Sequence, residues 1–135
     1  MQKNKKCIIY TRVARAEQLH TNNSLEAQIK YCEEFAHRKG FTEIKHMGGI
    51  AESANNQNRE TYRAMLNYAL DKRNGIEAII VYSFDRFSRY LASAVTDIEK
   101  LKRKNILLYS VQGENENSKN DLGMLLINFK LNSSL

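Results

Sequence analysis

Residues 76–82, Ile-Glu-Ala-Ile-Ile-Val-Tyr, are the clearest candidate for a buried β-strand, and the polar run Asp85-Arg86-Phe87-Ser88-Arg89 follows closely. A short apolar run rich in β-branched side chains is typical of a strand that is covered on both faces. Such strands belong to parallel sheets flanked by helices. The run therefore predicts a parallel α/β sheet, with charged residues just beyond the end of one strand.

The rest of the chain alternates between short apolar runs and helical patterns. Three further runs predict strands, at Cys7–Val13, Phe41–Met47 and Ile106–Val111. Apolar side chains at helical spacing predict helices from Asn23 to Gly40, from Asn58 to Gly75, after Ser88, and after a polar loop at 112–120. The alternation predicts an α/β fold of three layers, in which a mostly parallel sheet of four to five strands carries helices on both faces.

The helical patterns also predict caps and buried faces. Asn23 is placed to cap the first helix, with Glu26 reaching back to it. We expect Ser88 to cap the helix that follows it, and that helix to turn one apolar face to the core. The expected core positions of these two helices are Leu25, Ile29, Cys32 and Ala36 in the first and Leu91, Val95, Ile98 and Leu101 in the other.

Composition narrows the class of protein. The 135 residues fit one domain, and 42% hydrophobic with 27% charged residues is typical of globular chains. The net charge of +6 favours a polyanionic partner, nucleic acid first. Neither a membrane span nor a signal peptide is predicted, so we expect a cytoplasmic protein. Cys7 and Cys32 are expected to be buried thiols, and the three histidines lack metal-site spacing, so no metal or other cofactor is expected.

Several arginines fall where an α/β sheet carries its sites, beyond the carboxyl ends of the strands. These are Arg12, Arg59, Arg86 and Arg89, with Asp85 beside the last two. One guanidinium group can donate two parallel hydrogen bonds to a phosphate, and a carboxylate could orient the guanidinium groups. The plainer alternative is that Arg86 and Arg89 are solvated residues at a helix start. Cations oppose the helix dipole there, which argues for another role.

Four segments together resemble the catalytic domain of the serine recombinases, the resolvase/invertase family that includes the large serine integrases. They are Tyr10-Thr11-Arg12-Val13, Ser24-Leu25-Glu26-Ala27-Gln28, Glu52-Ser53-Ala54 followed by Arg59, and Asp85-Arg86-Phe87-Ser88-Arg89. The resemblance spans nearly the whole chain in order. It implies site-specific DNA recombination, in which a serine hydroxyl cuts DNA, a phosphoserine linkage forms, and strands are exchanged and religated within a tetramer.

The resemblance also implies roles for individual residues. Arg12, Arg59, Arg86 and Arg89 would bind the phosphate, and Asp85 would orient them or handle protons. Gln28 would be a polar residue of the active site, and Ser53 and Tyr10 would contribute to substrate binding. The plainer alternatives are a loop serine at 53 and, at 28, a boundary residue of the apolar stripe whose amide meets water.

The chain departs from the family at the position that matters most. The nucleophilic serine of the family corresponds to Ala14, and strand alternation places Tyr10, Arg12 and Ala14 on one side. A methyl group cannot attack phosphorus, and Ser53, Ser83 and Ser88 would each need accurate in-line placement to replace it. Ala54 replaces a usual glycine, and Gly49 or Ile50 stands where an acidic residue is common. An engineered substitution and a natural degenerate copy are both compatible with Ala14.

The C-terminal segment carries two apolar stripes. Family members have a long last helix there that mediates dimer contact, so we expect self-association through Leu122, Met124, Leu125, Ile127 and Phe129. We expect residues 1–135 to form the catalytic domain up to the start of that helix, without a DNA-binding domain.

Two other functions compete with a disabled recombinase. One is a catalytically inactive regulatory or dimerisation partner of an active recombinase. The other is an unrelated flavodoxin-like receiver or small-molecule domain, but Arg12 stands where a receiver would have an acidic pair, and residues 13–16 offer no glycine-rich turn. Resolution, inversion and integration are equally compatible with these residues, as is any target DNA site.

Overall fold

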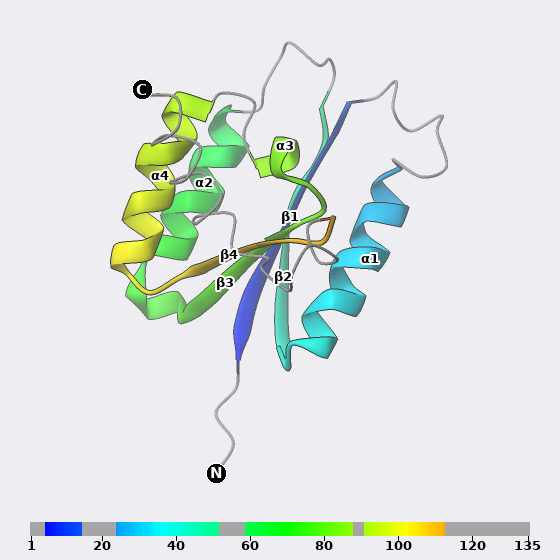
Figure 1. Cartoon of the computed structure of the whole chain (residues 1–135), viewed down its shortest axis with the longest axis horizontal. Coiled ribbons are helices and arrows are strands. Elements are labelled where there is room, and N and C mark those ends of the chain that lie inside the picture. Colours follow the sequence, from blue (N-terminus) through cyan, green and yellow to red (C-terminus); the bar gives the residue numbers. More distant parts are fainter. Residues whose placement is uncertain (1–4, 15–23, 52–58, 88–90, 113–135) are drawn as a thin grey trace, which may run out of the picture.

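The computed structural model describes residues 5–14, 24–51, 59–87 and 91–112 (Figure 1). Its strands are β1 (Lys6–Ala14), β2 (Glu43–Ala51), β3 (Ile76–Val81) and β4 (Leu107–Ser110). Its helices are α1 (Leu25–Arg38), α2 (Arg59–Leu70), the 3₁₀ turn η2 (Lys72–Asn74), the short α3 (Phe84–Phe87) and α4 (Leu91–Arg103).

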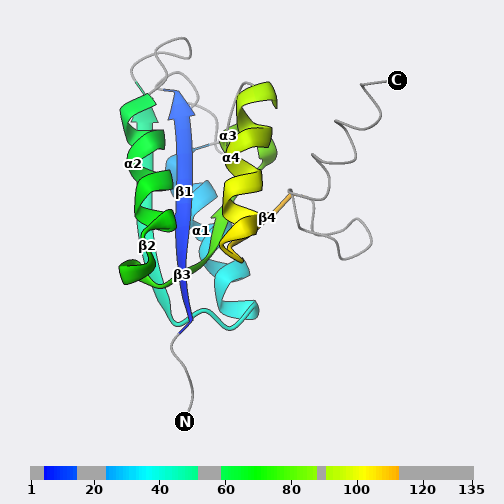
Figure 2. The same ribbon diagram turned by 90° about the vertical axis from the view of Figure 1, so that its left-hand side faces the viewer.

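The four strands form one sheet in the order β2-β1-β3-β4, and every neighbouring pair is parallel. β1 lies inside the sheet, with nine paired positions along β2 and a shorter pairing to β3. Helix α1 covers one face, and α2 and α4 cover the other (Figure 2). The predicted three-layer α/β fold, with a mostly parallel sheet of four to five strands, is confirmed: the described residues form four strands, and all are parallel.

Strand alternation divides the core into two layers. Ile8 and Tyr10 of β1 face the α2/α4 layer, while Cys7 and Ile9 face α1. Both cysteines are free and fully buried, as predicted, and burial raises the pKa of each thiol to about 12. Apolar packing on both faces therefore fixes the register of β1, the strand that carries Arg12.

Some boundaries differ from the sequence prediction. Ser24, not Asn23, caps α1, because its hydroxyl accepts the backbone N–H of Ala27 at 3.2 Å. Helix α2 ends at Leu70 rather than Gly75, since the Asp71 carboxylate accepts the backbone N–H of Arg73 and starts η2. The third strand ends at Val81, and the fourth is shorter than predicted.

The buried faces of the helices partly match the prediction. In α1 the buried side chains are Gln28, Cys32, Phe35 and Ala36, whereas Leu25 and Ile29 are half-buried. In α4, Val95, Ile98 and Leu101 are buried as predicted. Ser88 and the last predicted helix lie outside the described residues.

Strand β2 continues past its predicted end at Met47, and two glycines allow the continued pairing with β1. Gly48 pairs with Thr11 at a φ of 95°, and Gly49 pairs with Arg12 at a φ of 138°. A Cβ on Gly48 would lie 2.0 Å from the Thr11 carbonyl oxygen, whereas one on Gly49 would meet nothing within 4 Å. The close approach of β2 to the end of β1 therefore requires glycine at position 48.

We predict that Gly48→Ala lowers the free energy of unfolding by about 2 kcal/mol or more, because it combines a positive φ with a backbone clash. Gly49→Ala is the matched control, since it has a positive φ and open space. We expect it to cost about 1 kcal/mol. Urea unfolding measures both, and equal losses for the two variants would show that the contact with Thr11 is unimportant.

Candidate functional site

The carboxyl ends of the parallel strands define one edge of the sheet, and several of the predicted site residues lie there. β1 ends at Ala14, α2 begins at Arg59, and α3, which holds Asp85 and Arg86, follows β3 after two residues. Figure 1 shows α3 beside the end of β1. The backbone thus brings segments far apart in sequence to one edge, as the sequence predicted.

A hydrogen bond links the side chain of one predicted site arginine, Arg86, to the backbone of another, Arg12. Nη1 of Arg86 donates to the backbone carbonyl of Arg12 at 2.9 Å, although the residues are 74 positions apart. Both side chains are half-buried, and Nε of Arg86 is buried. Because the guanidinium is a planar fork, one directed bond constrains the direction of its other donors. Arg86 is therefore fixed against the end of β1.

Tyr10 and Gln28 approach this edge from opposite faces of the sheet. Tyr10 is 2% exposed and belongs to the α2/α4 layer. Burial raises the pKa of Tyr10, and the positive charge of Arg12 offsets part of that rise. Gln28 lies in the first turn of α1, where its backbone N–H donates to the backbone carbonyl of Ser24 at 3.1 Å. The sequence predicted Gln28 at the border of the apolar stripe, whereas the structure buries its side chain completely.

The remaining predicted residues are placed less completely. For Ala14, Arg59 and Asp85 the structure describes the backbone, at the end of β1, the start of α2 and in α3. Ser53 and Arg89 lie outside the described residues, as do the predicted dimer-contact positions Leu122, Met124, Leu125, Ile127 and Phe129. Their roles stay predictions.

The sequence prediction missed an aromatic cluster beneath the arginines. The Tyr62 ring on α2 meets the Tyr10 ring edge-on, with centroids 6.2 Å apart, and the Phe87 ring, with centroids 5.4 Å apart. The Tyr62 hydroxyl donates to Oδ2 of Asp97 on α4 at 2.7 Å. Helical spacing marked Tyr62 as a core residue, but nothing in the local pattern indicated its bond to Asp97.

The described residues hold no cluster of three or more His, Cys, Asp or Glu side chains that could bind a metal ion. Within the same part of the chain, no helix has the length and apolar character needed to cross a membrane.

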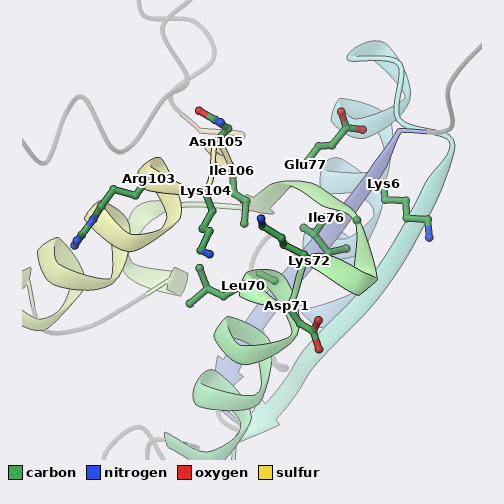
Figure 3. Close-up of a pocket in the computed structure, with 12 residues that line it drawn as sticks. Lys6, Leu70, Asp71, Lys72, Ile76, Glu77, Arg103, Lys104, Asn105 and Ile106 are labelled. Atoms are coloured by element: carbon green, nitrogen blue, oxygen red, sulfur yellow. The ribbon is translucent and has the colours of Figure 1, made fainter.

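A hollow of about 870 Å³ lies at the opposite edge of the sheet, where the strands begin (Figure 3). Lys72 and Lys104 line it and point toward one another above Leu70. They follow the C-terminal ends of α2 and α4, where cations complement the partial negative charge of the helix ends. Helix stabilisation accounts for these charges, which leaves the carboxyl edge as the candidate site.

Three solved structures share this fold. A resolvase family site-specific recombinase from Streptococcus pneumoniae aligns with a TM-score of 0.74 and 21% identity, over 97% of this chain and 89% of that one. The N-terminal catalytic domain of TP901-1 integrase aligns with a TM-score of 0.72 and 21% identity, over 96% and 95%. The C-terminal catalytic domain of ISC1926 TnpA, an IS607-like serine recombinase, has a TM-score of 0.62 and 21% identity, over 95% and 79%.

The family assignment rests on the sequence. A search of curated proteins found no match. The family model described as "Resolvase, N terminal domain" matches residues 7–131, which is well over half of the chain. That range includes β1 with Arg12 and α3 with Arg86, the two elements joined at the candidate edge. The chain therefore belongs to the resolvase N-terminal domain family, the catalytic domains of the serine recombinases.

Proposed function

We propose that this domain binds the phosphate backbone of double-stranded DNA at the carboxyl edge of its sheet, and that Ala14 leaves it unable to cut the strand. The observation that carries the proposal is the bond from Arg86 to the Arg12 carbonyl, which supports a shared arginine site. Membership of a family of site-specific recombinases supports DNA as the polyanion. The net charge of +6 agrees with that partner.

In this proposal the arginines do the binding. A phosphate in transfer carries negative charge on several oxygens, and several guanidinium groups can bind these oxygens at once. Arg12 and Arg86 hold one side of the phosphate, and Arg59 and Arg89 complete the set. Asp85 orients the arginines, Gln28 and Tyr10 support the site from the two faces of the sheet, and Ser53 lies close to the scissile phosphate.

The missing step is the nucleophilic attack. A serine at position 14 would supply an oxygen that forms a bond to phosphorus while the bond to the leaving deoxyribose oxygen breaks. Ala14 has no such oxygen. The alternative function, an inactive regulatory or dimerisation partner, is favoured by the same residue and uses the same phosphate contacts.

We predict that the unaltered chain forms no covalent adduct with DNA, because position 14 carries a methyl group. The measurement is denaturing electrophoresis after incubation with a pool of nicked duplexes of randomised sequence. An adduct from the unaltered chain would mean that another residue, such as Ser83, serves as nucleophile. Ala14→Ser separates the two functions, since a gained adduct marks a disabled recombinase rather than a dedicated partner.

We predict that sulfate raises the melting temperature beyond the effect of chloride at equal ionic strength. At about ten times its Kd, a bound anion stabilises the fold by 1–2 kcal/mol. Arg86→Ala should abolish this specific gain. Arg103→Ala, which removes an exposed arginine at the opposite edge, should retain it. Equal sulfate responses in both variants and the parent would mean that the arginines act as separate surface charges.

We further propose self-association through the apolar stripes that contain Met124 and Ile127, with a tetramer forming when two DNA sites are brought together. Replacing both residues with Asp should shift the sedimentation coefficient towards that of the monomer, because buried carboxylates oppose association. Far-UV circular dichroism checks that the fold is retained. A parent chain that stays monomeric at high micromolar concentration would contradict this part of the proposal.

A further inference from the structure

Tyr62 lies where the elements that carry the candidate arginines meet. It follows Arg59 by three residues on α2, which is about one helical turn. Its ring contacts Tyr10, two residues before Arg12 on β1, and Phe87, the residue after Arg86 on α3. One side chain therefore touches or belongs to three elements that each bring an arginine to the same edge.

The ring contacts are directional. The Tyr10 and Tyr62 planes cross at 65°, and the Tyr62 and Phe87 planes cross at 76°, so both pairs are edge-to-face. Such pairs have an orientation preference that aliphatic packing lacks, because the positive edge of one ring meets the negative face of the other. Tyr10 and Phe87 are 2% and 1% exposed, so neither ring has room to shift. Tyr62 thus fixes α3 relative to β1 from within the core layer that α2 and α4 cover.

The hydroxyl of Tyr62 adds a fourth element. It donates to Oδ2 of Asp97 on α4 at 2.7 Å, in a half-buried environment where a bond to a carboxylate is strong. Burial raises the pKa of Tyr62 well above its usual range, and the bond to Asp97 raises it further. The hydroxyl therefore keeps its proton and remains a donor at any physiological pH. This bond holds α2 against α4 and limits rotation of the ring.

We propose that Tyr62 is a positioning residue for the arginine site: it holds β1, α2 and α3 so that Arg12, Arg59 and Arg86 can bind one phosphate together. This inference rests on the proposed phosphate site. The bond from Arg86 to the Arg12 carbonyl depends on that arrangement, because a hydrogen bond of 2.9 Å weakens steeply when its partners move or tilt. Tyr62 touches no phosphate itself and acts through the arginines.

The test is the affinity of the folded chain for inorganic sulfate, measured by titration well below the melting temperature. Tyr62→Leu removes both ring contacts and the hydroxyl, and we expect it to weaken sulfate binding on the order of tenfold, since two aromatic pairs and a charged hydrogen bond are lost. Tyr62→Phe keeps the ring contacts and should recover about half of the lost binding free energy, which leaves sulfate binding about threefold weaker than in the parent. Tyr68→Phe removes a hydroxyl from the same helix away from the cluster and should leave the affinity unchanged.

A double-mutant comparison separates positioning from general destabilisation. In an Arg86→Lys background, which keeps the positive charge but loses the guanidinium that bonds to the Arg12 carbonyl, adding Tyr62→Leu should weaken sulfate binding by clearly less than it does in the parent, because part of the geometry through which Tyr62 acts is already gone. Independent, additive losses would overturn the positioning role, as would an unchanged affinity in Tyr62→Leu. If the parent does not bind sulfate, or Arg86→Ala binds it as tightly as the parent, the phosphate site itself is wrong and this inference falls with it.

Discussion

The four strands in the described part of the chain all run in one direction, and this constraint generates the candidate site. Parallel pairing places the ends of β1, β2 and β3 and the starts of the helices that follow them at the same edge. β1 is buried on both faces, so its register cannot slip without moving apolar side chains out of one core layer. The position of Arg12 is therefore set by Ile8 and Ile9 below it. The Arg86 guanidinium then reaches a carbonyl whose place is already fixed.

The succession of strands and helices could be predicted from the sequence because it depends on local periodicity. Local signals failed where tertiary contacts decide the outcome. The strand predicted at Phe41–Met47 stops before the glycines at 48 and 49, yet pairing with β1 carries β2 through them at positive φ. Gln28 was placed beside an apolar stripe, and its complete burial depends on how closely α1 packs against the sheet. Ser24 rather than Asn23 caps that helix, a choice between adjacent cap-forming side chains.

The candidate site shows the same division. The edge of the sheet at which Arg12, Arg59 and Arg86 lie could be predicted from the order of the segments, because parallel strands share their carboxyl ends. The bonds that hold the site could not be predicted in this way, since Tyr62 and Asp97 are 35 residues apart and on different helices. In the proposed function, Ala14 stands at the position that the resemblance gives to the nucleophile, and phosphate recognition is the chemistry that the remaining side chains would perform. In that proposal binding does not require the side chain at position 14, because the Arg86 guanidinium bonds to the backbone carbonyl of Arg12.

The central claim is that arginines from different elements form one anion site at the carboxyl edge. The most direct measurement is an NMR titration that follows the side-chain Nε–H signals of individual arginines as inorganic phosphate is added. The account predicts that the signals of Arg12 and Arg86 shift together and saturate with one Kd, while that of Arg103 at the opposite edge stays unchanged. Separate Kd values for Arg12 and Arg86, or an equal response from Arg103, would contradict it.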